Sequence, residues 1–140
     1  MAAIRRIKKD LDKILKEEDN GMMVDFDESD IFQVTALMQG PEGTPWEGGV
    51  FELAVKFSEE YPNKCPEVVF KSQMFHPNIY ADGRICLDIL NTQWSPVYDT
   101  WAILISIRSL LTNPNPQSPA NKFACDIFLN NKIDYERRVK

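Results

Sequence analysis

Four runs of alternating apolar and polar residues between positions 24 and 72 constrain the fold more than any other sequence feature. They read VDFDE (24–28), IFQVTALMQ (31–39), VFELAVKF (50–57) and EVVFKS (67–72). Because side chains alternate across a strand, one face of the third run collects four apolar residues, namely Phe51, Leu53, Val55 and Phe57. The connections are short and rich in Gly and Pro, as in PEGTPWEGG. This arrangement predicts an antiparallel meander of four strands.

Helical periodicity is found on both sides of these strands. Ahead of them, apolar residues recur every three or four positions at Ile4, Ile7, Leu11, Ile14 and Leu15. This spacing predicts an amphipathic helix of about four turns that ends at Asn20-Gly21. Farther along, TWAILISIRSLL (100–111) is apolar on nearly every side, which is typical of the central helix of a core. Two short helices are expected in ANKFACDIFLN (120–130) and KIDYERRVK (132–140).

Residues 71–99 show no sustained period. A loop of this length in a small domain is usually functional or disordered. Its many apolar residues argue against disorder: Met74, Phe75, Ile79, Ile85, Leu87, Ile89, Leu90 and Trp94. The order helix, sheet, long loop, helices is typical of the α+β class, and 140 residues predict one domain spanning 1–140.

The charge of the chain is distributed unevenly. Residues 1–16 carry six basic and two acidic side chains, a net +4, so a total of −5 leaves −9 on the remainder. A nucleic-acid binder usually spreads basic charge over a whole face, so the distribution favours protein partners, although a solvated helix face is the simpler reading. No apolar run approaches a membrane span, and the charged N-terminal sequence lacks the apolar core of a signal peptide.

The chain has three cysteines, Cys65, Cys86 and Cys125, and a single histidine, His76. The irregular spacing, without any CxxC, favours neither a disulfide framework nor a metal site, and a reducing cytosol or nucleus is expected. We expect Cys65 to be a partly exposed loop thiol. Cys125 lies on an apolar helical face and is expected to be buried.

A Cys and a His suggest a thiol hydrolase, whose imidazole must reach the thiol and be oriented by a third group. His76 precedes Pro77 beside an apolar Met74-Phe75 pair, which favours a structural imidazole that bonds the backbone. Spacing alone favours Cys86, among aliphatic residues, as a small buried hydrophobe rather than a nucleophile. The amide of Asn78 either donates to a developing oxyanion or forms a turn.

Several motifs together resemble the ubiquitin-conjugating enzyme family over almost the whole chain. They are GPEGTPWEGG (40–49), EEYPNKCPEV (59–68), the tripeptide His76-Pro77-Asn78, YADGRICLDIL (80–90), WSPVYD (94–99) and NPNPQSPAN (113–121). The resemblance implies the ubiquitin-conjugating fold and a catalytic core that accepts ubiquitin from the activating enzyme as a thioester on Cys86. A ligase then assists transfer to a substrate lysine. The alternatives are a different ubiquitin-like modifier, or an inactive ubiquitin-binding variant, against which Cys86 and Asn78 argue.

The same resemblance assigns roles around the nucleophile. His76 and Pro77 are structural, and Asn78 stabilises the oxyanion or shapes the loop near it. Asp88 and Ser118 occupy the rim of the gate through which the lysine enters; many relatives have an acid at the position of Ser118. Arg84 is unusual two residues before the nucleophile, and we hypothesise that it favours the Cys86 thiolate, with a solvated loop arginine as the alternative.

Partner surfaces are also implied by the resemblance. The activating enzyme would meet Arg5, Arg6 and Lys9, whereas a ligase would meet Arg5, Pro62, Asn63, Ser95 and Pro96. Asn63 stands where some relatives place a Phe, which favours a RING-type ligase. We expect a monomer without cofactor or metal, because ATP is used by the upstream activating enzyme, and without nucleic-acid or membrane contact.

The finer resemblance is carried by EEYPNK, FHPNIYADG and NPNPQSPAN. It is to the subfamily associated with post-replication DNA repair and histone monoubiquitination. A location in both cytoplasm and nucleus is expected.

Overall fold

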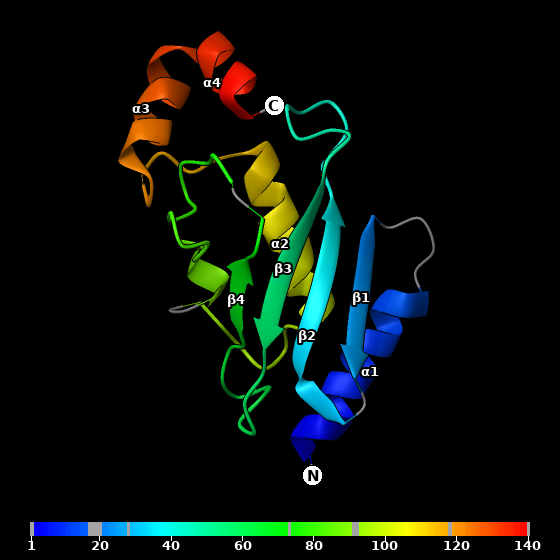
Figure 1. The fold of residues 1–140 in the computed structure, drawn as a ribbon. Coiled ribbons are helices and arrows are strands. Elements are labelled where there is room, and N and C mark those ends of the chain that lie inside the picture. The colour runs from blue at the N-terminus through cyan, green and yellow to red at the C-terminus, as the bar shows by residue number, and fades with distance from the viewer. Residues whose placement is uncertain are drawn as a thin grey trace.

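The computed structural model describes residues 2–16, 21–27, 29–72, 74–90, 93–117 and 119–139. Its strands are β1 (Met22–Asp27), β2 (Asp30–Gln39), β3 (Val50–Lys56) and β4 (Glu67–Phe70). They form one antiparallel sheet in the order β1-β2-β3-β4 (Figure 1). The predicted four-stranded meander is therefore confirmed.

The helices also fall where helical periodicity predicts them. They are α1 (Ala2–Lys16), α2 (Thr100–Thr112), α3 (Lys122–Asn130) and α4 (Lys132–Val139), and a short 3₁₀ helix, η1 (Asp88–Leu90), lies within the long loop. Figure 1 shows α1 and α2 on one face of the sheet and α3 with α4 at one end of the molecule. None of the described helices is long and apolar enough to cross a bilayer.

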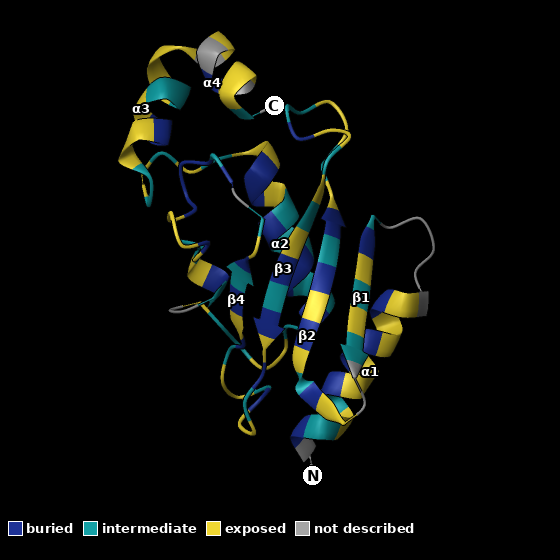
Figure 2. Cartoon of the chain, viewed as in Figure 1, coloured by how far each residue is buried: buried dark blue, intermediate teal, exposed yellow. Residues whose placement is uncertain are grey.

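The core lies between the sheet and α1 with α2. The strand register places Val34 opposite Val55 and Ala36 opposite Leu53, and all four side chains are buried. Burial alternates along β2 and β3 because only one face of the sheet is covered (Figure 2). Helix α2 adds Ile103, Leu104, Ile107 and Leu111 to this core.

Helix α1 buries a narrower stripe than the sequence predicts. Ile7, Leu11 and Ile14 are buried, whereas Leu15 is 54% exposed. Since each residue turns the helix by about 100°, the Leu15 side chain points about 100° away from that of Ile14. Leu15 therefore lies outside the stripe formed by Ile7, Leu11 and Ile14. The predicted end at Asn20-Gly21 falls partly outside the described residues, which do not include Asn20, and Gly21 has a positive φ of 77° just before β1.

A buried carboxylate on this stripe joins α1 to two other segments. Asp10 accepts hydrogen bonds from the Tyr61 hydroxyl and, at 3.3 Å, from the backbone N–H of Thr100 at the start of α2. Its other oxygen accepts from Arg6 Nε at 3.1 Å. A buried charge is costly unless it is paired and hydrogen-bonded. Asp10 therefore fixes the loop around Tyr61 and the beginning of α2 against α1.

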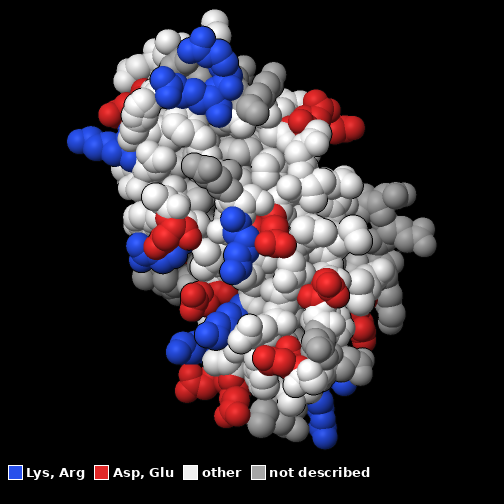
Figure 3. Space-filling model, viewed as in Figure 1, with Lys and Arg blue, Asp and Glu red and all other residues white. Residues whose placement is uncertain are grey.

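The outer surface differs from one region to the next. Figure 3 shows Lys and Arg side chains gathered over α3 and α4, with both charge signs intermixed over the sheet. A groove of about 1210 Å³ lies on the open face of the sheet, and its lining includes Asp25, Thr35, Lys56 and Glu67. Cys86 is not among the residues that line this groove.

The Asp10 network yields a stability prediction. Replacing Asp10 with Ala should lower the free energy of unfolding by about 3 kcal/mol, because Tyr61 and Arg6 lose a buried charged partner. The exposed Asp12 on the same helix provides a matched control, and Asp12→Ala should change stability by less than about 0.5 kcal/mol. Urea unfolding would measure both variants. Equal losses in the two would contradict the role of Asp10.

Candidate active site

Cys86 lies on a short antiparallel hairpin inside the long loop, which we call the Cys86 hairpin (residues 78–86). The backbone N–H of Cys86 donates to the Asn78 carbonyl at 2.8 Å, and that of Tyr80 donates to the Arg84 carbonyl at 2.8 Å. Ile79 pairs with Ile85 between these two rungs. The ladder gives the nucleophile candidate a defined backbone position within an otherwise irregular segment.

Gly83 attaches this hairpin to the sheet. Its φ is +93°, in the left-handed region, and its carbonyl accepts from the backbone N–H of Phe70 on β4 at 2.9 Å. A Cβ at this position would lie 2.1 Å from the Phe70 carbonyl oxygen. Glycine is therefore required by both backbone conformation and contact.

His76 bonds the backbone through both ring nitrogens. Nδ1 accepts from the Asn78 N–H at 2.9 Å, so Nε2 carries the proton and donates to the Leu110 carbonyl at 2.8 Å. Leu110 is in the last turn of α2, where carbonyls lack helical partners. Burial lowers the pKa of His76 to about 4. A neutral ring occupied at both nitrogens has no place for the Cys86 proton, which removes the base that a thiol hydrolase needs.

Asn78 connects the hairpin to the segment after α2. Its Nδ2 donates to the Asn115 carbonyl at 2.7 Å, and its Oδ1 accepts from the Asn115 N–H at 2.7 Å. The adjacent carbonyl of Pro77 accepts from the N–H groups of Ala120 and Asn121 at 2.8 and 3.0 Å. These bonds correspond to the loop-shaping role considered for Asn78, and donation to an oxyanion stays a prediction.

The three thiols differ in their surroundings. Cys86 is half-buried and free. Cys65 is also half-buried, 3.3 Å from the Pro66 carbonyl, and burial raises its pKa to about 11. Cys125 is buried, with its sulfur 3.7 Å from the Pro116 carbonyl. Since a nucleophile must form thiolate, a raised pKa disfavours Cys65.

Of the two residues predicted to form the gate for the incoming lysine, the structure describes Asp88 but not Ser118. Asp88 is exposed at the start of η1, where Oδ1 accepts from the N–H of Ile89 at 2.7 Å. This bond orients the carboxylate of Asp88, which follows Cys86 by two residues in the chain. Ser118 lies outside the described residues.

Arg84 contacts two neighbours in the Cys86 hairpin, Asp82 and Tyr80. Its Nε donates to Asp82 Oδ2 at 2.8 Å, and its guanidinium carbon lies 4.8 Å from the centroid of the Tyr80 ring. Neither contact involves Cys86. The effect of Arg84 on the thiol remains a prediction.

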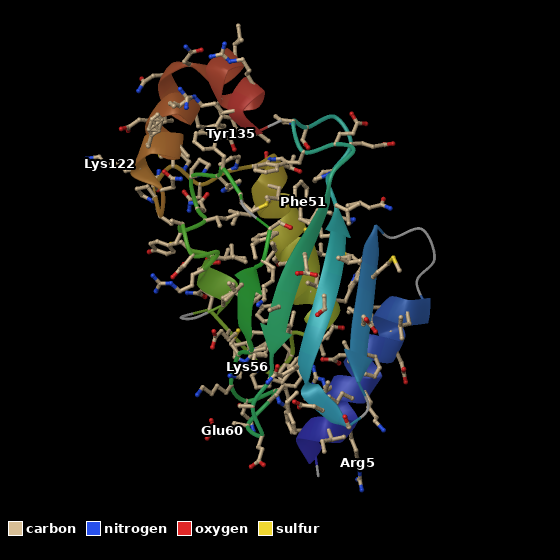
Figure 4. All side chains as sticks on the ribbon, viewed as in Figure 1. Arg5, Phe51, Lys56, Glu60, Lys122 and Tyr135 are labelled. Atoms are coloured by element: carbon tan, nitrogen blue, oxygen red, sulfur yellow. The ribbon has the colours of Figure 1, made fainter. Side chains whose placement is uncertain are left out.

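The predicted partner residues lie near one end of α1. Arg5 and Lys9 are exposed, as are Asn63 and Pro96, whereas Pro62 and Ser95 are half-buried. Figure 4 shows Arg5 at the same end of the molecule as Glu60 in the neighbouring loop. The indole Nε1 of Trp94 donates to the Pro62 carbonyl at 2.9 Å, which joins the two loops predicted to meet a ligase.

Arg6, predicted to meet the activating enzyme, makes intramolecular contacts. Its Nη2 donates to the carbonyls of Pro96 and Tyr98 at 3.1 and 2.9 Å, in addition to the Nε bond with Asp10. Arg6 thereby holds the 95–98 loop against α1. A groove of about 570 Å³ lies beside these contacts and includes Lys9, Lys13 and Val97 in its lining.

Sequence reasoning missed three residues that organise this site. Leu110 and Asn115 act through their backbone groups, which leave no side-chain signal. Asp10 left a signal, because it is a charged residue on the stripe that contains Ile7 and Ile14. A charge on a buried stripe is a reason to look for partners.

The buried imidazole predicts a specific pH dependence. An unfolded His takes up a proton near pH 6.5 but His76 only near pH 4, so its contribution to stability is complete above pH 6.5 and is lost as pH falls toward 4. Between pH 7 and pH 5 the loss should be roughly 2 kcal/mol. Urea unfolding at both pH values would measure it. His76→Gln should be less stable but should lack this part of the pH dependence.

Gly83 provides a second prediction. Gly83→Ala should lower the free energy of unfolding by about 3 kcal/mol or more, because strain at positive φ adds to the clash with Phe70. Gly43 is the matched control, since its φ is +75° and a Cβ there would meet nothing within 4 Å. Gly43→Ala should therefore cost only about 1–2 kcal/mol. Similar losses by chemical denaturation would contradict the close approach.

Comparison with known proteins identifies the family. Residues 6–140 match the ubiquitin-conjugating enzyme family. The Arabidopsis thaliana protein "Ubiquitin-conjugating enzyme E2 3" is 52% identical over 137 residues, covering 98% of this chain and 91% of the relative. The Caenorhabditis elegans "Ubiquitin-conjugating enzyme E2 1" is 50% identical over 136 residues, covering 97% of this chain and 71% of the relative. The chain belongs to the ubiquitin-conjugating enzyme family.

Proposed function

We propose that Cys86 carries ubiquitin as a thioester in this ubiquitin-conjugating enzyme. The Cys86 thiolate attacks the ubiquitin carbonyl held on the cysteine of the activating enzyme, and that enzyme's thiolate leaves. The exchange converts one thioester into another, so it needs a thiolate rather than a strong general base. The full occupation of both His76 nitrogens is the observation that best supports this chemistry over hydrolysis.

In the second step, a substrate lysine attacks the thioester carbonyl and the Cys86 thiolate leaves. A free lysine has a pKa of about 10.4, so the amine must lose a proton before or during attack. We assign the exposed carboxylate of Asp88 to the acceptor side of the gate. The family resemblance assigns Ser118 to the same gate. Asn78 shapes the loop through Asn115 or donates to the oxyanion.

The thioester can be tested directly. Incubation with activating enzyme, ATP and ubiquitin should give a reductant-sensitive adduct on a non-reducing gel. Cys86→Ser should give no adduct or a reductant-resistant ester, because an alkoxide leaving group replaces a thiolate. Cys65→Ser is the control, since Cys65 is also half-buried but has a raised pKa, and it should charge normally.

Three results would contradict the proposal. If Cys86→Ser retained a reductant-sensitive adduct, the nucleophile would be another thiol. If the folded wild type gave no adduct with ubiquitin but charged with another ubiquitin-like modifier, the modifier would be different. No adduct with any modifier would favour a binding-only domain.

We propose a partner-binding surface from the exposed residues of α1 and of the two loops beside it. Arg5 and Lys9 would contact the activating enzyme directly, while Arg6 would contribute through the 95–98 loop that it holds. Arg5 and the two loops joined by Trp94 would also meet the ligase, so the two partners would compete. Asn63, exposed in one of these loops, is the basis for proposing a RING-type ligase.

We also propose a biological setting for this enzyme. Three motifs, EEYPNK, FHPNIYADG and NPNPQSPAN, support membership of the subfamily that acts in post-replication DNA repair and histone monoubiquitination. A monomer that works in the cytoplasm and the nucleus fits such a role.

A further inference from the structure

Arg84 is held in a fixed orientation on the surface of the Cys86 hairpin. Its Nε donates to Asp82 Oδ2 at 2.8 Å, and Asp82 Oδ1 accepts from the Arg84 backbone N–H at 3.1 Å. The guanidinium also stacks on Tyr80, with its carbon 4.8 Å from the ring centroid. The side chain is nevertheless 66% exposed. Two contacts thus orient a group that solvent still reaches.

The terminal nitrogens of this guanidinium indicate a binding site for a ligand. An arginine side chain has five N–H donors in a planar fork, and the bond to Asp82 uses the one on Nε. In the part of the chain that the structure describes, neither Nη nitrogen has a hydrogen-bond partner. The two terminal groups therefore remain available for a second anion.

The hairpin register brings Arg84 to the same face as Cys86. The pairs Tyr80–Arg84 and Asn78–Cys86 flank the Ile79–Ile85 bridge. Because side chains alternate along an extended segment, residues 84 and 86 project to one side, with Cα atoms roughly 7 Å apart. The guanidinium extends over Tyr80 toward Asp82 in the turn. We infer that an acceptor protein that reaches Cys86 over this face also passes the open end of the arginine fork.

We propose that Arg84 binds a carboxylate of the acceptor protein, supplied by an Asp or Glu close to the lysine that attacks Cys86. The inference rests on the proposed thioester at Cys86 and specifies which lysines it would reach most readily. A planar fork binds a carboxylate through two parallel hydrogen bonds. Because Tyr80 and Asp82 already hold the fork in place, little side-chain entropy is lost on binding.

Asp82 maintains the fork rather than occupying its open end. Its pKa is lowered, chiefly by the hydrogen bond from the Arg84 N–H, so it remains a charged partner near neutral pH. An exposed pair of this kind contributes little to folding stability. Its larger effect is to fix the direction of the guanidinium.

The hairpin spacing also predicts where the acid should lie. In an extended acceptor peptide, side chains two positions apart lie on the same face and are separated by roughly 7 Å, the spacing between Arg84 and Cys86. An acid two residues before or after the acceptor lysine therefore fits best.

Single-turnover discharge to peptides would test this inference. The charged enzyme, freed of ATP, would be mixed with capped peptides that contain one Lys and either Glu or Gln two residues away on each side. The wild type should discharge to the better Glu peptide roughly 3- to 10-fold faster than to its Gln match. The ratio should fall as salt is raised, because exposed charges are screened.

Variants at position 84 separate charge from geometry. Arg84→Gln should bring the ratio close to one, and Arg84→Lys, which keeps the charge but lacks the fork, should give an intermediate ratio. Because the ratio is taken within each variant, a slow overall discharge does not obscure it. Urea unfolding should show little change in stability for either variant.

Several outcomes would overturn the inference. If the wild type discharged equally fast to the Glu and Gln peptides, or if Arg84→Gln kept the preference for Glu, Arg84 would not bind the acceptor carboxylate. A change in charging without a change in ratio would place the contact on the donor ubiquitin instead. Failure of the wild type to form a thioester would be a separate result, since it would count against the proposed function.

Discussion

The hydrogen bonds that the His76 and Asn78 side chains form with backbone groups hold the active-site loop in place. The irregular residues that precede the Cys86 hairpin do not satisfy their backbone groups in a ladder, so side chains supply the partners. His76 joins the loop to the free carbonyl of Leu110 at the end of α2, and Asn78 satisfies both backbone groups of Asn115. His76 therefore fixes the loop before Cys86 to α2, and Asn78 fixes it to the segment after α2.

This use of the imidazole determines what chemistry the site can perform. A ring that bonds the backbone at both nitrogens stays neutral and is unavailable to Cys86. The hairpin, anchored to β4 through Gly83, instead presents a thiol at a fixed position. Such a site suits exchange between thioesters, in which positioning matters more than proton abstraction. The second step then depends on groups that act on the incoming amine.

Local periodicity explains what could be predicted from the sequence. The strands and helices can be predicted because β3 alternates and α1 repeats within a few residues, although Leu15 lies outside the stripe that α1 buries. Spacing alone favours Cys86 as a buried hydrophobe, and its role as the nucleophile is proposed from the family resemblance. The Asp10 network and the Asn115 contacts join residues far apart in the chain, several of them through backbone atoms, so no local pattern encodes them.

Arg6 and Arg84 show why hydrogen-bond partners, rather than residue type, distinguish structural from binding groups. Arg6 Nη2 is bonded to two loop carbonyls and its Nε to Asp10, so this arginine holds the 95–98 loop in shape. Among the described residues, the Arg84 guanidinium forms its hydrogen bond through Nε alone, and the side chain is 66% exposed although it stacks on Tyr80. In sequence, both are basic residues in solvated segments. When the terminal nitrogens of a guanidinium bind backbone carbonyls, the arginine stabilises the fold. When the guanidinium is held through Nε and its terminal nitrogens are open, the arginine is preorganised to bind an anion from another molecule.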